Sequence, residues 1–227
     1  IRNSIERSSA RETASRVAAG AVAKLLLDQF DIKVGSFVES IGGEYANPEL
    51  INKLFSNVLF NEYGNAAELS KKADLSDVRV LNTSHENAII EKIKKAKKQG
   101  DTLGGTFFVI ATGVPYGLGS YMHYDKRIDT EIAASIMSIN AVKGVEIGAA
   151  LLAAESFGSE SHDEIILKDN EFYRKTNRAG GIEGGITTGL PIIVKGMMKP
   201  IATLMSPIKS IDFKTFSEVE SRRERSD

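Results

Sequence analysis

The sequence has 227 residues and contains neither cysteine nor tryptophan. Because cysteine is absent, the chain forms no disulfide bond and offers neither a thiolate nucleophile nor a sulfur ligand for a metal ion. A small secreted scaffold held together by disulfides is therefore excluded. Proteins of a reducing compartment do without disulfides, so the composition is compatible with a cytoplasmic location.

An excess of charge of either sign is also missing. Lysine and arginine number 29, aspartate and glutamate number 30, and the formal net charge is −1. Proteins that bind nucleic acids usually carry a basic excess, so we expect no nucleic-acid partner. No apolar run approaches the ~18 residues that a membrane-spanning helix needs, and no secretory signal sequence is visible. We therefore expect no membrane partner.

Several catalytic patterns are missing as well. The three histidines, His85, His123 and His162, do not have the spacing of metal ligands, so we expect no metal site. No serine lies in the Gly-x-Ser-x-Gly pattern of a nucleophile elbow. A glycine-rich segment at residues 178–189 matches neither the dinucleotide-binding fingerprint nor the phosphate-binding loop with its lysine.

The first predicted helix begins with a capping box, in which Ser9 is followed three residues later by Glu12. Apolar residues then recur at helical spacing from Ala14 to Leu25. Small residues at positions 18–21 would let another backbone approach closely. We therefore expect this helix to pack tightly in the middle of the fold.

The rest of the chain predicts both helices and antiparallel strands. Helices are expected to begin at Pro48, at a Ser84 cap and at an Asp129 cap, whereas residues 61–83 are polar and weakly patterned. Strands are expected at residues 35–41, 104–114, after Gly144 and at 190–199, with a hairpin at 164–176 that turns at Asp169-Asn170. This mixture indicates an α+β protein without internal repeats.

The N-terminus of the first helix is suited to an anionic ligand. Its free amides lie beside Arg7 and Arg11, whose guanidinium groups match phosphate oxygens. Alternatively, Ser9 only caps the helix, and the two arginines are solvated or pair with Glu6 and Glu12.

Three later segments also suit an anion. The glycines of residues 178–189 let a flat or charged ligand approach the backbone. Lys199 and Thr203 could bind a phosphate or the electron-rich edge of a flavin. The final residues, RRERSD, place an arginine near an aspartate. Each signal is weak by itself, because a solvated lysine, an irregular turn or a charged tail explains it equally well.

Five segments, in this order, closely resemble chorismate synthase: RSSARETASRVAAGA, INAVKGVEIG, RAGGIEGGIT, MKPIATL and RSD. The resemblance implies a lyase that converts 5-enolpyruvylshikimate 3-phosphate into chorismate and phosphate with reduced FMN, the last step of the shikimate pathway. It also implies a core of long helices sandwiched between antiparallel β-sheets, a cytoplasmic homotetramer, and, in some members, reduction of the flavin by NADPH.

The same resemblance implies roles for particular residues. Arg11 and Arg225 would contact the substrate, and Asp227 would be catalytic, relaying a proton from the flavin N5. The implied flavin contacts are Arg7, Ser8, Ser9, Asn140, Ala141, Gly184, Lys199, Pro200, Ile201, Ala202, Thr203 and Arg225.

The sequence departs from the family pattern at its ends. The family's two histidine motifs are missing, so residues 1–227 would be the central and C-terminal-side portion of a single domain, and no catalytic histidine is assigned. We expect this piece alone to be inactive, because an active site without its acids loses orders of magnitude in rate. The alternatives are a flavin-dependent oxidoreductase, a folded assembly or flavin-binding piece without turnover, and a generic anion-binding module.

Overall fold

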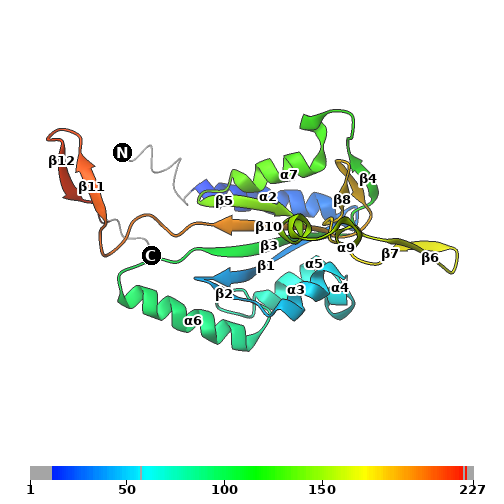
Figure 1. Ribbon diagram of the computed structural model, residues 1–227, viewed down its shortest axis with the longest axis horizontal. Helices are drawn as coiled ribbons and strands as arrows, with labels where there is room; N and C mark the ends of the chain where they lie inside the picture. The colour runs from blue at the N-terminus through cyan, green and yellow to red at the C-terminus, as the bar shows by residue number, and fades with distance from the viewer. Residues whose placement is uncertain (1–11, 57, 222, 224–227) are drawn as a thin grey trace.

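A five-stranded antiparallel sheet forms the centre of the computed structural model, which describes residues 12–56, 58–221 and 223. The order of its strands is β2-β1-β3-β10-β5 (Figure 1). Their bounds are Lys33–Ile41 for β1, Glu44–Tyr45 for β2, Gly105–Thr112 for β3, Val142–Ile147 for β5 and Ile192–Met198 for β10. The strands expected from the sequence are thus confirmed, although β5 begins two residues earlier than Gly144.

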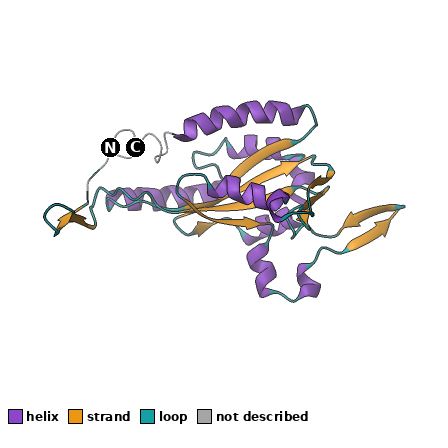
Figure 2. Cartoon of the chain, turned by 90° about the horizontal axis from the view of Figure 1, so that it is seen from above, coloured by secondary structure: helices purple, strands orange, loops and turns teal. Residues whose placement is uncertain are grey.

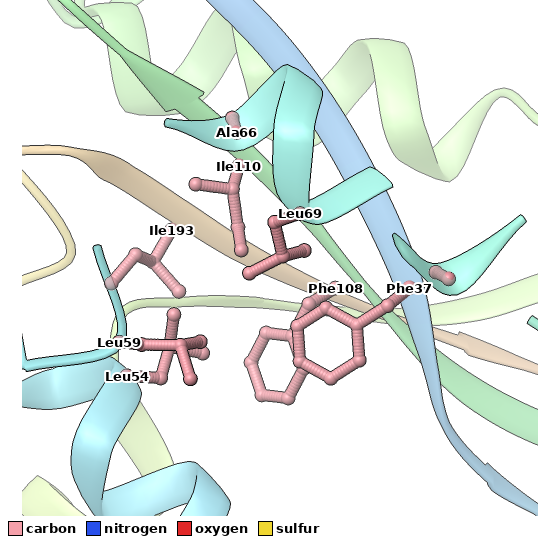
Figure 3. Close-up of a cluster of buried hydrophobic side chains, with 9 residues drawn as sticks. Phe37, Leu54, Leu59, Ala66, Leu69, Phe108, Ile110 and Ile193 are labelled. Carbon is pink, nitrogen blue, oxygen red and sulfur yellow. The ribbon is translucent and has the colours of Figure 1, made fainter. Parts of the chain in front are cut away.

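One face of the sheet is covered by three short helices, α3 (Pro48–Phe55), α4 (Val58–Tyr63) and α5 (Ala66–Ala73). Successive side chains of a strand point to opposite faces, and those that point to this face meet helix side chains. Figure 3 shows this cluster, in which the rings of Phe37 and Phe108 stack with centroids 5.4 Å apart. Helix α6 (Thr83–Lys98) continues this layer beside β2.

The opposite face packs mainly against α7 (Ile128–Met137). Ile136 of this helix is buried against strand residues that include Val142 and Val194. Helix α2 (Glu12–Asp28) lies on the same side of the sheet (Figure 1), but none of its residues is buried. The sequence-based expectation that this helix packs tightly in the middle of the fold is therefore wrong for the described residues.

Two hairpins project from opposite ends of the molecule (Figure 2). One is β6 (Ile165–Lys168) with β7 (Glu171–Arg174), which turns at Asp169-Asn170 as expected. The other, β11 (Lys209–Asp212) with β12 (Ser217–Glu220), was not anticipated from the sequence. The remaining elements are β4 (Tyr116–Gly119), η1 (Tyr124–Lys126), α8 (Ala150–Glu155), α9 (Gly158–Ser161), β8 (Ile182–Glu183) and β9 (Ile186–Thr188).

Two helix caps differ from expectation. Asn82, not Ser84, caps α6, because its side chain accepts from the amides of Ser84 and His85. Helix α7 begins at Ile128, so Asp129 lies inside its first turn, where its carboxylate favourably meets the positive end of the helix dipole. The expected α+β class is confirmed, with helices on both faces of an antiparallel sheet. No helix in the described ranges is long and apolar enough to cross a membrane.

Candidate functional site

The turn between α7 and β5 holds Asn140 and Ala141, which are the first expected flavin contacts within the described residues. Ala141 has φ of 70°, a conformation that costs a residue with a side chain about 1 kcal/mol or more. Its carbonyl accepts a hydrogen bond of 3.0 Å from the backbone amide of Lys199. The pairing of β10 with β5 shifts register beside this bond, between Met197 and Met198. A strained turn and an irregular strand end therefore meet at one point.

The segment from Lys199 to Thr203 leaves the sheet at this same point. Lys199, Pro200, Ile201 and Ala202 are exposed, and Thr203 is half-buried. The structure therefore brings together two segments that are far apart in the sequence, Asn140-Ala141 and Lys199 onwards. The result is an open edge with an exposed lysine, which suits an anionic ligand.

Gly184 lies elsewhere. It occupies the turn between β8 and β9 with φ of 60°, and a Cβ atom there would meet nothing within 4 Å. The carbonyl of its neighbour Gly185 accepts from the amide of Ile128, the first residue of α7, at 3.0 Å. Asn140 and Ala141 follow the other end of α7, about 15 Å along the helix. The structure thus does not place Gly184 beside the other expected flavin contacts.

The remaining expected site residues, Arg7, Ser8, Ser9, Arg11, Arg225 and Asp227, lie outside the described residues. The start of α2 is nevertheless linked to the Asn140 turn. Arg16 forms an ion pair of 2.9 Å with Glu12, and its Nη1 atom donates to Ser138 Oγ at 2.8 Å. Because Ser138 directly follows α7, this contact ties the first helix to the turn that carries Asn140.

Two buried polar residues anchor the loop that leads to Gly184. The carboxylate of Asp163 accepts from Thr176 Oγ1 at 2.5 Å and from the amides of Arg178 and Ala179 at 2.8 and 3.0 Å. Asn177 donates to the carbonyl of Pro191 and accepts from the amide of Gly181, each at 2.8 Å. The local sequence does not indicate either role. Asp163 lies in a polar stretch typical of a surface, and Asn177 directly precedes the glycine-rich segment.

A charged cluster in the sheet was also missed. Lys195 of β10 donates to both carboxylate oxygens of Glu39, at 2.9 and 3.1 Å, and lies 3.8 Å from Glu146. Thr106 donates to Glu39 at 2.7 Å. Lys195, Glu39 and Glu146 border a cavity of about 180 Å³ near α3 and α8. Lys195 lies four residues before Lys199, about 13 Å along the chain, and its ion pairs link strands of the central sheet.

Beside the Gly184 turn, Arg127 pairs with Asp129. Its guanidinium hydrogen bond holds the pKa of Asp129 below its ordinary value of 3.8. Asp129 is therefore charged at neutral pH, and it serves the start of α7.

The histidines lie apart from one another. His85 contacts the carbonyl of Glu44 at 3.1 Å, and His123 contacts Asp125. In the ranges that the structure describes, no three histidine or carboxylate side chains are grouped so as to hold a metal ion.

Comparisons with known proteins identify the family. A family model described as chorismate synthase matches residues 1–227. Proteins named chorismate synthase from Oceanobacillus iheyensis and Geobacillus thermodenitrificans are 49% identical over 231 residues and 50% identical over 228. Each match covers all of this chain but 56% of the relative, so the chain spans little more than half of their length.

A solved structure supports the same relationship. A crystal structure of chorismate synthase superposes with a TM-score of 0.79 at 46% sequence identity, over 88% of this chain and 58% of that one. The segments that meet at Ala141 and Lys199 are among those that resemble this family in sequence. The chain belongs to the chorismate synthase family.

Proposed function

We propose that this chain supplies flavin- and substrate-binding surfaces for the elimination of phosphate from 5-enolpyruvylshikimate 3-phosphate, which yields chorismate. Membership of the chorismate synthase family supports this reaction. The observation that carries the proposal to particular residues is the backbone bond between Lys199 and Ala141, because it joins two expected flavin segments at one open edge. The Arg16–Ser138 contact supports it, since it brings the start of α2 toward the same edge.

The reaction is a 1,4-anti elimination in which the bond to the phosphate breaks and a C6 proton leaves, without net oxidation. Reduced FMN, when bound, supplies electron density transiently. The chain contributes charge and shape. Lys199 attracts phosphate-bearing ligands, Thr203 offers a hydroxyl donor, and the exposed residues 199–202 leave room for a planar ring to approach.

The described residues fit a flavin in part. The edge at Ala141 and Lys199 has the exposed residues and the cation that such a ligand needs. Gly184 has open space around it but lies at the other end of α7. We propose that Arg11 and Arg225 bind the substrate and that Asp227 handles the proton, as the resemblance implies.

We also propose that residues 1–227 form the central and C-terminal-side part of one domain and lack turnover by themselves. The share of the relatives that the chain covers supports this view. The complete protein would be a cytoplasmic homotetramer.

The test is an anaerobic titration of FMN together with the substrate, with flavin absorbance and chorismate followed in one cuvette. It uses this chain and a chimaera in which residues 1–227 replace their counterpart in the Geobacillus thermodenitrificans relative. We expect the chain to bind flavin without forming chorismate, and the chimaera to form it.

Other outcomes identify the alternatives. A net two-electron change in the substrate would indicate an oxidoreductase. Phosphate binding without a preference for flavin would indicate a generic anion site. A chimaera that folds and assembles by light scattering, yet neither binds flavin nor forms chorismate, would contradict the proposal.

A further inference from the structure

We propose that the loop between α6 and β3, residues 99–104, positions the Lys199–Thr203 segment for its ligand, and that Thr102 is the principal positioning residue. This inference rests on the proposed function, because it concerns the segment that would hold the flavin. Thr102 itself lies in none of the segments that resemble the family.

Three hydrogen bonds join the loop to the segment. Thr102 Oγ1 donates to the carbonyl of Ile201 at 2.7 Å. Further along, the amide and the hydroxyl of Ser206 donate to the carbonyls of Gly100 and Gln99, each at 3.0 Å. Together with the bond from Lys199 to Ala141, these contacts fix residues 199–206 from two sides, although this stretch belongs to no helix or strand.

The end of α6 explains why those carbonyls are available. Gly100 has φ of 68°, the left-handed conformation that terminates many helices, and the amide of Asp101 turns back to the carbonyl of Ala96. The chain reverses there, and the carbonyls of Gln99 and Gly100 remain free to accept from Ser206. Gly100, which ends α6, thus also leaves available the carbonyl groups that hold residues 199–206.

Close backbone contact completes the support. A Cβ atom on Gly104 would lie 2.5 Å from the carbonyl oxygen of Met198 and 3.0 Å from Cδ of Pro200. Only glycine lets Pro200 pass this closely. Just after β10 ends at Met198, the segment is therefore confined by shape where Pro200 passes Gly104 and by the hydrogen bond from Thr102 to Ile201.

Such confinement matters because residues 199–202 are exposed. A flexible segment must lose conformational freedom when it binds a ligand, whereas a segment held in place beforehand loses less. The Thr102 bond reduces that loss without touching the ligand, so we class Thr102 as a positioning residue.

The test compares three variants. Thr102→Val keeps the shape of the side chain but removes the donor, Thr102→Ser keeps the donor, and Thr83→Val changes an exposed threonine at the far end of α6. Amide hydrogen exchange of residues 199–208 in the ligand-free chain reports positioning, and FMN titration of the chimaera reports its consequence.

We expect Thr102→Val to accelerate exchange in this segment and to weaken flavin binding roughly three- to tenfold, the effect of losing one neutral hydrogen bond. Thr102→Ser and Thr83→Val should behave like the parent. Unchanged exchange in Thr102→Val, or faster exchange with unchanged flavin affinity, overturns the inference while the proposed function stands. If the parent chimaera binds no flavin, the proposed function fails, and the ligand role of Thr102 fails with it.

Discussion

Lys195 lies between two acidic side chains of the central sheet, and its replacement should lower the stability of the fold. Its ammonium faces two carboxylates, and the side chains of Glu39 and Glu146 are nine-tenths or more buried. We expect Lys195→Met to lower the free energy of unfolding by about 3–5 kcal/mol, because it leaves buried carboxylates without a counter-charge. Urea denaturation of the purified chain measures the effect.

Two controls separate the loss of charge balance from the loss of packing. The double change Lys195→Met with Glu39→Gln should recover much of the stability, since one uncompensated charge is removed with the lysine. Lys209→Met breaks an exposed ion pair with Glu218 and should change little. A Lys195→Met variant as stable as the parent would mean that water reaches the cluster.

The cluster of Lys195 could not be predicted from the sequence, because its members lie on four strands and no local pattern links them. Lys199 and Thr203 could be singled out from the residues alone, whereas Asn140, Ala141 and residues 200–202 were identified only by resemblance to a family. The structure adds the hydrogen bond between Lys199 and Ala141 that joins the two segments. It also adds Thr102, Asp163 and Asn177, whose partners are mostly backbone groups that a sequence does not reveal.

At the scale of single elements, the helices α4 and α5 were missed. Both are short, and six or eight residues carry too little periodicity to stand out from polar neighbours. The sequence nevertheless contains a residue type typical of a helix N-cap directly before α5. Asn65 accepts from the amides of Ala67 and Glu68 at 2.9 and 3.1 Å, and Leu69 of the same helix is fully buried in the core.

We expect Asn65→Ala to destabilise the chain by about 1 kcal/mol, the usual cost of losing a helix N-cap. The matched control is Asn61→Ala, an exposed position within α4, where alanine's higher helix propensity should make the change neutral or slightly stabilising. Thermal unfolding by circular dichroism distinguishes them. Equal melting temperatures for the two variants would contradict the role of the cap.

The longer elements were easier to predict. A short candidate stretch became β1, an apolar run between glycines became β3, an alternating stretch became β10, and Pro48 marked the start of α3. The hairpin turn at Asp169-Asn170 was also correct, because both residues adopt the positive φ that such turns need. The local sequence was sufficient to predict these elements, whereas the order in which the strands pair could be determined only from the structure.

At the scale of the whole molecule, the exposed helix α2 raises the question of what covers it. Its Val17, Val22, Leu25 and Leu26 are each more than 60% exposed. The family resemblance implies a core of long helices between two sheets, whereas the described residues hold one large sheet beside α2. We expect the additional family segments of the chimaera to lie against this helix.

Gly20 in α2 tests that expectation. A Cβ atom there meets nothing within 4 Å, so Gly20→Ala should stabilise the isolated chain by about 0.5–1 kcal/mol through helix propensity alone. In the chimaera the same change should stabilise less or destabilise, because a packed neighbour would meet the new methyl group. Equal stabilisation in both proteins would show that α2 remains uncovered.

The hairpin of β6 and β7 has a consequence for handling the protein. In the described residues it is a sheet of only two strands, and Ile165, Leu167 and Phe172 on it are largely exposed, the last at 81%. A free strand edge with apolar side chains is a template on which further chains add. Concentrated solutions of this chain should therefore precipitate through the hairpin, and Leu167→Lys should keep them clear without altering the five-stranded sheet.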